Sequence, residues 1–172
     1  MDQRLIVVRL SEVKWSCREE DILVAYSLGS CVGLVLWDPV RRAGGMAHIF
    51  LPTASGSSAS SISKGSRPDD RTPGKYADLA VPYLISRLEE IGCRKERLVA
   101  KVAGGAHVIA GLSSPIGDVG ALNVRLVEEM LRKAGIPIIG RDVGGTYGRT
   151  MRFYVNSGRV TISSVSHGEK DL

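Results

Sequence analysis

Short apolar segments separated by turn residues most constrain the fold of this chain. Segments of about four to eight apolar residues bounded by glycine, proline or polar residues are typical of β-strands. We expect such strands at residues 5–10, 21–27, 31–37, 46–51, 98–102, 136–139, 151–155 and 159–165. Only residues 76–91 and about 121–134 carry the spacing of an amphipathic helix.

The order of these elements predicts the fold class. The first four strands follow one another without an intervening helix, which favours an α+β fold over an alternating α/β fold. No linker divides the 172 residues, so we expect a single domain over residues 1–172. A serine-rich segment at about 53–74 predicts a flexible loop, and the polar residues 166–172 predict a frayed tail.

Composition excludes several classes of protein. The sequence shows neither a signal peptide nor an apolar run long enough to span a bilayer, so a cytoplasmic location is expected. The net charge of +5 favours an acidic partner, but the basic residues are dispersed and do not indicate nucleic acid. Three cysteines without C-x-x-C spacing predict free thiols, with neither a disulfide framework nor a metal site.

Cys31 is the first candidate catalytic residue. It follows Gly29 and Ser30 at the start of a predicted strand, where a turn exposes the sulfur and brings backbone N–H groups close to it. Those N–H groups are suited to stabilising an oxyanion. The competing interpretation is a small buried core residue, since free cysteines pack well in apolar interiors.

His48 is the second candidate. It lies in the next short apolar strand, and pairing of residues 31–37 with 46–51 as a hairpin brings its imidazole near Cys31. A neighbouring imidazole lowers a thiol pKa and activates the nucleophile. Ser27, which shares a face with Ala25 if the strand is regular, is a candidate to orient the ring. No Asp or Asn partner is evident.

Other signals are weaker. The glycine pairs at 104–105 and 144–145 match neither a P-loop nor a dinucleotide fingerprint, and are more simply tight strand exits. His107 and His167 have no partners at metal-ligand spacing. The sequence therefore indicates neither a metal nor an organic cofactor.

Around Cys31 and His48, and in further motifs along the sequence, the chain resembles the CheD family of chemoreceptor glutamine deamidases in bacterial chemotaxis. The resemblance runs from about residue 5 to 165, and its motifs occur in order. They are residues 27–32 (SLGSCV), 37–40 (WDPV), 45–52 (GMAHIFLP), 74–78 (GKYAD), 101–106 (KVAGGA), 116–117 (IG), 123–124 (NV), 142–146 (DVGGT), 148–149 (GR) and 157–160 (SGRV).

The resemblance implies packed β-sheets with helices on one side, similar to the catalytic domain of cytotoxic necrotizing factor toxins. It implies conversion of glutamines on chemoreceptor cytoplasmic helices to glutamate, in some members also hydrolysis of receptor methyl esters. It implies no cofactor, no membrane insertion and binding of a CheC-like phosphatase. The family's nucleophile and histidine fall on Cys31 and His48.

One family position differs in this chain. The family's third residue, a threonine six positions before the cysteine, falls on Ala25, which has no hydroxyl. Ser27 or a backbone carbonyl is then expected to orient His48, with Gly29 and Ser30 serving the substrate and oxyanion. The alternative function is a binding module for a CheC-like phosphatase or a receptor. A generic cysteine peptidase is disfavoured because His48 lacks an Asn or Asp partner.

Overall fold

The computed structural model describes residues 2–54, 71–107 and 117–172. These residues form ten strands, two α-helices and one short 3₁₀ helix, η1 (Lys95–Arg97), in the predicted α+β class. The strands make two five-stranded mixed sheets. The outer sheet contains, in spatial order, β1 (Arg4–Val7), β3 (Asp21–Leu28), β8 (Arg149–Tyr154), β9 (Val160–Ser164) and β10 (Gly168–Asp171). The central sheet contains β2 (Val13–Ser16), β5 (Ala43–Ile49), β4 (Val32–Asp38), β6 (Val99–Gly104) and β7 (Ile138–Val143).

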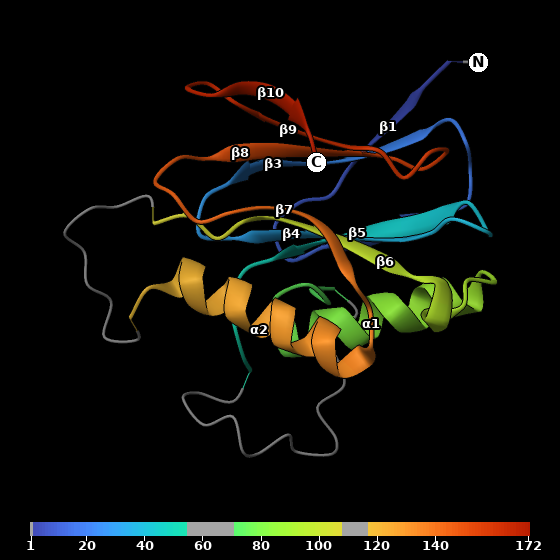
Figure 1. Ribbon diagram of the computed structural model, residues 1–172, viewed down its shortest axis with the longest axis horizontal. Coiled ribbons are helices and arrows are strands. Elements are labelled where there is room, and N and C mark those ends of the chain that lie inside the picture. Colours follow the sequence, from blue (N-terminus) through green and yellow to red (C-terminus); the bar gives the residue numbers. More distant parts are fainter. Residues whose placement is uncertain (1, 55–70, 108–116) are drawn as a thin grey trace.

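The molecule has three layers. Figure 1 shows α1 (Ala77–Glu90) and α2 (Val119–Ala134) on one face of the central sheet, with the outer sheet on the other face. This is the predicted arrangement of packed sheets with two helices on one side. Neither helix is long and apolar enough to cross a membrane, as judged over the described residues.

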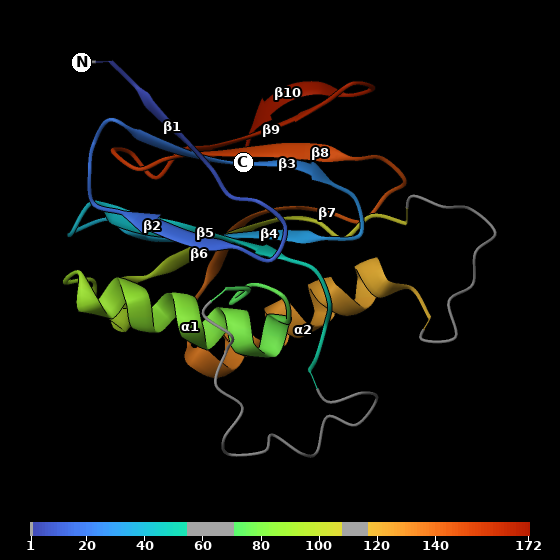
Figure 2. The ribbon, with the colours of Figure 1, turned by 180° about the vertical axis from the view of Figure 1, so that it is seen from behind.

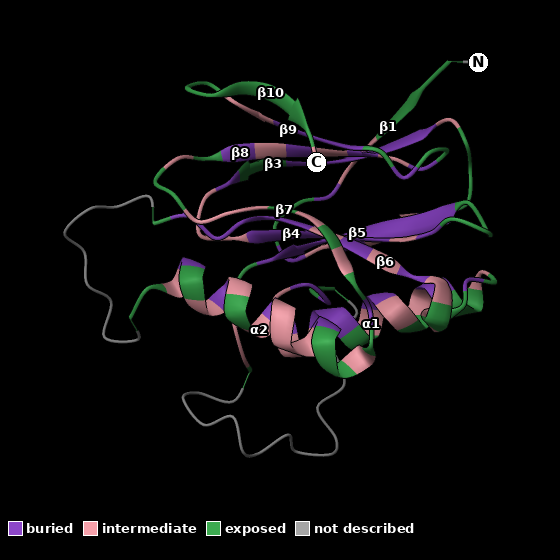
Figure 3. Cartoon of the chain, in the orientation of Figure 1, coloured by how far each residue is buried: buried purple, intermediate pink, exposed green. Residues whose placement is uncertain are grey.

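The central sheet is buried on both faces, which explains its nearly continuous apolar strands. In β4, Leu34 and Leu36 belong to the core beneath the helices, whereas Val35 belongs to the core between the sheets. Every residue of β5 is buried, and Figure 3 shows the contrast with the exposed strand β10. Side chains that alternate along β4 and β5 therefore enter two different cores.

The helices begin and end at the residues expected from their sequence. Asp118 caps the start of α2 by accepting a hydrogen bond of 3.1 Å from the Ala121 N–H. At its end, Gly135 adopts the left-handed conformation with φ of 72°, and the Ile136 N–H bonds back to the Leu131 carbonyl. The apolar face of α1 packs on β5 and β2.

Four expectations need correction or fall outside the described residues. The strand predicted at 5–10 ends at Val7, because the chain then crosses to the central sheet and forms β2, which was not predicted (Figure 2). The tail is not frayed: residues 168–171 form β10, paired antiparallel with β9. The strand predicted at 136–139 lies at 138–143. Most of the predicted loop at 53–74 lies outside the described residues.

Candidate active site

The turn that carries Cys31 is held against the end of β6. It connects β3 to β4 through Gly29, Ser30 and Cys31. The Ala106 N–H donates to the Gly29 carbonyl and the Gly105 N–H donates to the Cys31 carbonyl, both at 2.8 Å. A side chain on residue 104 would collide with the Cys31 carbonyl, so this approach requires the glycine found there. The glycine pair at 104–105 is therefore a tight strand exit that also supports the turn.

Cys31 and His48 face the same interior layer. In the β4–β5 hairpin Gly33 pairs with His48 and Val32 with Ile49, which confirms the predicted pairing of these strands. Cys31 packs against the core between the sheets, as does Met46, two residues before His48. Cys31 and His48 are thus diagonal neighbours, a relation that typically separates Cα atoms by about 7–8 Å. Gly33, which lies directly opposite His48 and two residues after Cys31, has no side chain.

The His48 ring is fixed by the main chain. Its Nδ1 lies 3.1 Å from the carbonyl oxygen of Val8. A carbonyl only accepts hydrogen bonds, so Nδ1 carries the hydrogen and Nε2 keeps its lone pair in the neutral ring. The His48 backbone is also bonded in both directions, from its N–H to the Glu12 carbonyl and from the Ser11 N–H to its carbonyl. His48 is therefore held with Nε2 available as a base.

Burial opposes charge on both candidate residues. It raises the pKa of the Cys31 thiol to about 11, although the residue's own backbone N–H acts in the opposite direction. Burial also lowers the pKa of His48, despite its hydrogen bond to Val8. The expected lowering of the thiol pKa by His48 is therefore not found. At neutral pH the resting pair is a thiol and a neutral imidazole.

Ser27 does not share a face with Ala25, contrary to the expectation from a regular strand. The pairing of β3 with β8 shifts register between Ala25 and Leu28, as it does at a β-bulge. Ser27 adopts φ of 56° and is exposed, while Leu28 takes the inward position. Ala25 is fully buried. The ring acceptor found in the structure is instead the Val8 carbonyl, which no side-chain pattern signals.

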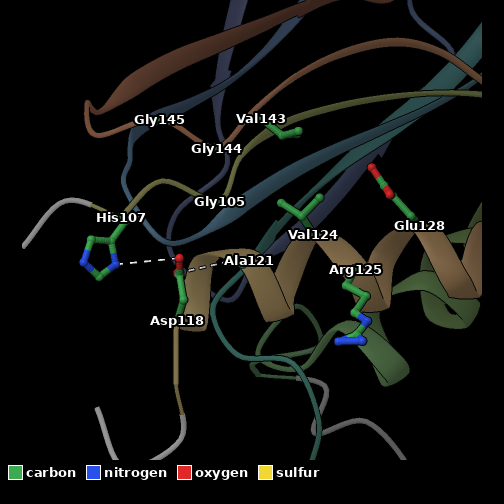
Figure 4. A pocket seen from close by; sticks show the side chains of 10 residues that line it. All are labelled: Gly105, His107, Asp118, Ala121, Val124, Arg125, Glu128, Val143, Gly144 and Gly145. Atoms are coloured by element: carbon green, nitrogen blue, oxygen red, sulfur yellow. Dashed lines mark hydrogen bonds and ion pairs between the residues drawn. The ribbon is translucent and has the colours of Figure 1, made fainter. Parts of the chain in front are cut away.

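A pocket of about 300 Å³ lies beside this site, between the start of α2 and the ends of β6 and β7. Figure 4 shows His107 next to Asp118, whose carboxylate lies 3.7 Å from the His107 Nδ1. Neither Cys31 nor His48 lines the pocket. Arg125 and Glu128 place both signs of charge on its wall, so it does not indicate a phosphate site.

Metal chemistry has no visible ligand set in this part of the molecule. Over residues 2–54, 71–107 and 117–172, no three His, Cys, Asp or Glu side chains gather in a way that could hold an ion. His167 instead stacks on Tyr147, with ring centroids 3.9 Å apart.

The three-layer α+β fold, with a half-buried Cys31 and a buried His48 on neighbouring chain segments, defines a class of protein with a candidate thiol–imidazole site. Residues 51–164 match the family model described as CheD chemotactic sensory transduction. A probable chemoreceptor glutamine deamidase CheD of Symbiobacterium thermophilum is 43% identical over 173 residues, covering 99% of both chains. Proteins of the same name from Caldanaerobacter subterraneus subsp. tengcongensis and Clostridium botulinum (strain Hall) are 36% and 35% identical, over 99% and 100% of both chains. The chain belongs to the CheD family.

Proposed function

We propose that this chain is a protein-glutamine deamidase that acts on chemoreceptors in chemotaxis. The observation that carries the proposal is the placement of Cys31 and His48 in one layer, with His48 Nδ1 occupied by Val8 and Nε2 available as a base. The names of the full-length relatives supply the substrate class. Cysteine dependence is part of the proposal.

In the proposed reaction His48 acts as general base and then as general acid. Its Nε2 takes the thiol proton as the Cys31 sulfur attacks the glutamine carboxamide carbon. The tetrahedral intermediate collapses, the C–N bond breaks, and His48 returns the proton to the departing ammonia. His48 then removes a proton from water, which attacks the thioester, and the Cys31 thiol and a glutamate side chain are released. A resting neutral pair suits this sequence, because each half of the reaction begins with proton removal by an uncharged imidazole and ends when the imidazolium gives that proton away.

The turn before Cys31 is the proposed oxyanion site. The Gly29 carbonyl points toward Ala106, to which it is hydrogen-bonded. In a planar trans peptide the following N–H, that of Ser30, points in the opposite direction. Gly29 and Ser30 thus supply the proposed substrate contacts, with the N–H groups of Ser30 and Cys31 as donors to the developing negative oxygen.

The same two-step chemistry extends to receptor methyl esters. Attack of Cys31 on a receptor glutamyl methyl ester would release methanol by the same two steps, which is the proposed methylesterase activity. The proposed partners are receptor cytoplasmic helices and a CheC-like phosphatase, in the cytoplasm. We also propose that residues 1–172 form one deamidase domain and that this domain is similar to the catalytic domain of the cytotoxic necrotizing factor toxins.

A second candidate function is supported by one observation at the site. The raised pKa of the Cys31 thiol leaves little thiolate at neutral pH, which favours weak catalysis. A chain with little activity would act mainly as a binding module for the phosphatase or the receptor. Binding measured without turnover would support this function.

The deciding experiment is mass spectrometry of a receptor cytoplasmic fragment incubated with the protein. Wild type should convert defined glutamines to glutamate, whereas Cys31→Ala should convert none. Cys17→Ala is the matched control, since Cys17 is an exposed thiol outside the site, and it should behave as wild type. Equal conversion by wild type and Cys31→Ala, or none by either, would overturn the proposed reaction.

A further inference from the structure

A buried asparagine on α2 contacts the turn that carries Cys31. Asn123 is fully buried, and it lies on the face of α2 that also buries Gly120, Val127 and Leu131. Its Nδ2 donates to the Ser30 carbonyl at 2.9 Å and to the Phe50 carbonyl at 3.0 Å. An amide on an otherwise apolar helix face is costly to bury unless such bonds are made.

The two bonds require an amide group at this position. Both partners are carbonyls, so the atom facing them must be the NH₂ end of Asn123, and both of its hydrogens are used. The other end, Oδ1, is buried and has no hydrogen-bond partner within the described residues. Asn123 therefore keeps an unsatisfied acceptor in order to hold two main-chain oxygens.

The Ser30 carbonyl controls the direction of the Cys31 N–H, because both belong to one planar peptide. Since Asn123 draws that carbonyl toward α2, the Cys31 N–H points away from the helix. In the described part of the chain this N–H donates to no backbone carbonyl. It also favours the thiolate form of its own side chain, because it lowers the pKa of the thiol against the larger effect of burial.

The second bond reaches the strand opposite. Val32 pairs with Ile49, so Phe50 lies one residue further along, across from Cys31. Asn123 thus connects α2 to both chain segments that flank the sulfur. Phe50 is 37% exposed, so this segment reaches the surface of the protein.

We propose that Asn123 is a positioning residue for the deamidation, one that directs the Cys31 N–H at the developing oxyanion and fixes the spacing between the Cys31 turn and Phe50. This inference rests on the proposed function. It assigns Asn123 no contact with the reacting atoms. A misdirected donor should lower kcat and leave KM nearly unchanged, because substrate binds before negative charge develops.

The near-isosteric variant Asn123→Asp is the sharpest test. Burial will raise the pKa of the new carboxyl, and its protonated form has one donor, so at least one of the two carbonyls loses its partner. We expect kcat for receptor glutamines to fall about 100-fold, the scale of a lost oxyanion donor or of a small displacement. Asn156→Asp, at an exposed turn residue, is the matched control and should keep wild-type kinetics.

Asn123→Ala removes both donors and provides a second variant. Each variant is assayed well below its melting temperature, with circular dichroism confirming the fold. A folded Asn123 variant with the kcat of wild type overturns the inference. Unfolding of both variants also overturns it, because Asn123 would then stabilise the whole fold and not position the Cys31 turn in particular. If wild type does not deamidate the receptor fragment, and Cys31 is alkylated equally fast in wild type and Asn123→Asp, both the proposed function and this inference are overturned. Active wild type with unaffected variants removes the inference alone.

Discussion

The Nδ1 of His48 and the carbonyl oxygen of Val8, forty residues apart in the chain, lie 3.1 Å apart between the two sheets. Val8 is itself anchored, since its N–H donates to the Val24 carbonyl at 2.8 Å. The acceptor that orients the imidazole is thus part of the backbone where the chain leaves the outer sheet. Orientation of the imidazole therefore does not require a hydroxyl at residue 25. The Ser27 hydroxyl is not the acceptor either, because Ser27 is exposed and adopts a positive φ.

Two substitutions of His48 separate its two nitrogens. In His48→Asn the amide NH₂ can replace Nδ1 as donor to Val8, whereas in His48→Gln the longer side chain extends toward the place of Nε2. Both should lose about 100- to 10,000-fold in kcat, the usual contribution of a general base. His48→Gln should also lose about 1–3 kcal/mol of unfolding free energy, because the Val8 carbonyl is left unpaired. Ammonia release and urea unfolding measure the two effects; equal stability of the variants would contradict the assigned hydrogen bond.

Ala25→Thr tests whether the missing hydroxyl limits the enzyme. Ala25 is fully buried in the core between the sheets, so the added atoms should lower the unfolding free energy by about 1–3 kcal/mol. We expect kcat to stay within about twofold of wild type, because Nδ1 already has its acceptor. A large gain in kcat, measured on the same receptor fragment, would show that Val8 orients the ring poorly.

The sequence predicts the elements around Cys31 and His48 better than it predicts how the two residues are supported. The hairpin of β4 and β5 follows from dense apolar runs on both sides of a turn, and the helices follow from their spacing. The four-residue strands β2 and β10 do not, because β2 mixes Lys14 with apolar residues and β10 (GEKD) has no apolar residue at all. β10 is held by pairing with β9 and by the ion pair of Arg159 with Asp171 at 2.7 Å.

The misplacement of Ser27 has a different cause. Alternation along a strand assumes a regular pleat, and the register shift before Leu28 reverses the faces. The contacts of Val8 and Asn123 could not be predicted from the sequence for a further reason. A backbone carbonyl has no residue type to recognise, and the Asn123 bonds join residues 73 and 93 positions apart.

The pH dependence of alkylation tests the resting state of Cys31. With a thiol pKa of about 11, its reaction with iodoacetamide should accelerate about tenfold for each pH unit below that value. At neutral pH the exposed Cys17 should react first, and the buried Cys93 should stay protected by lack of access. Peptide mass spectrometry gives the rate for each thiol. Fast, pH-independent alkylation of Cys31 around neutrality would instead reveal a thiolate–imidazolium pair.

Acid stability should depend on His48. Burial lowers its pKa in the folded chain below the ordinary value of 6.5, so the unfolded chain binds a proton more readily. The contribution of His48 is therefore present above pH 6.5 and is lost as pH falls through the folded-state pKa. The carboxylates with lowered pKa values, such as Asp21 and Asp38, titrate below this range. Urea unfolding between about pH 7 and pH 5 should show a steeper loss for wild type than for His48→Asn; parallel losses would contradict the shift.

Gly33, directly opposite His48, should not tolerate a side chain. A Cβ at this position would lie 2.6 Å from the Met151 sulfur and 2.9 Å from the Leu28 Cδ1. Gly33→Ala should therefore lower the unfolding free energy by about 1–3 kcal/mol and reduce kcat, since Leu28 leads directly into the Cys31 turn. In the control Gly148→Ala, where the nearest atom is a backbone oxygen at 3.9 Å, stability should change by less than about 1 kcal/mol.

A double variant then identifies the source of the Gly33→Ala defect. Met151→Ala removes the sulfur that the new methyl group meets, so it should cost less stability in the Gly33→Ala background than in wild type. The coupling free energy from the four urea unfolding curves should be favourable by about 1 kcal/mol or more, as expected for residues in contact. Additive losses would show that the new methyl group is accommodated without pressing on the Met151 sulfur.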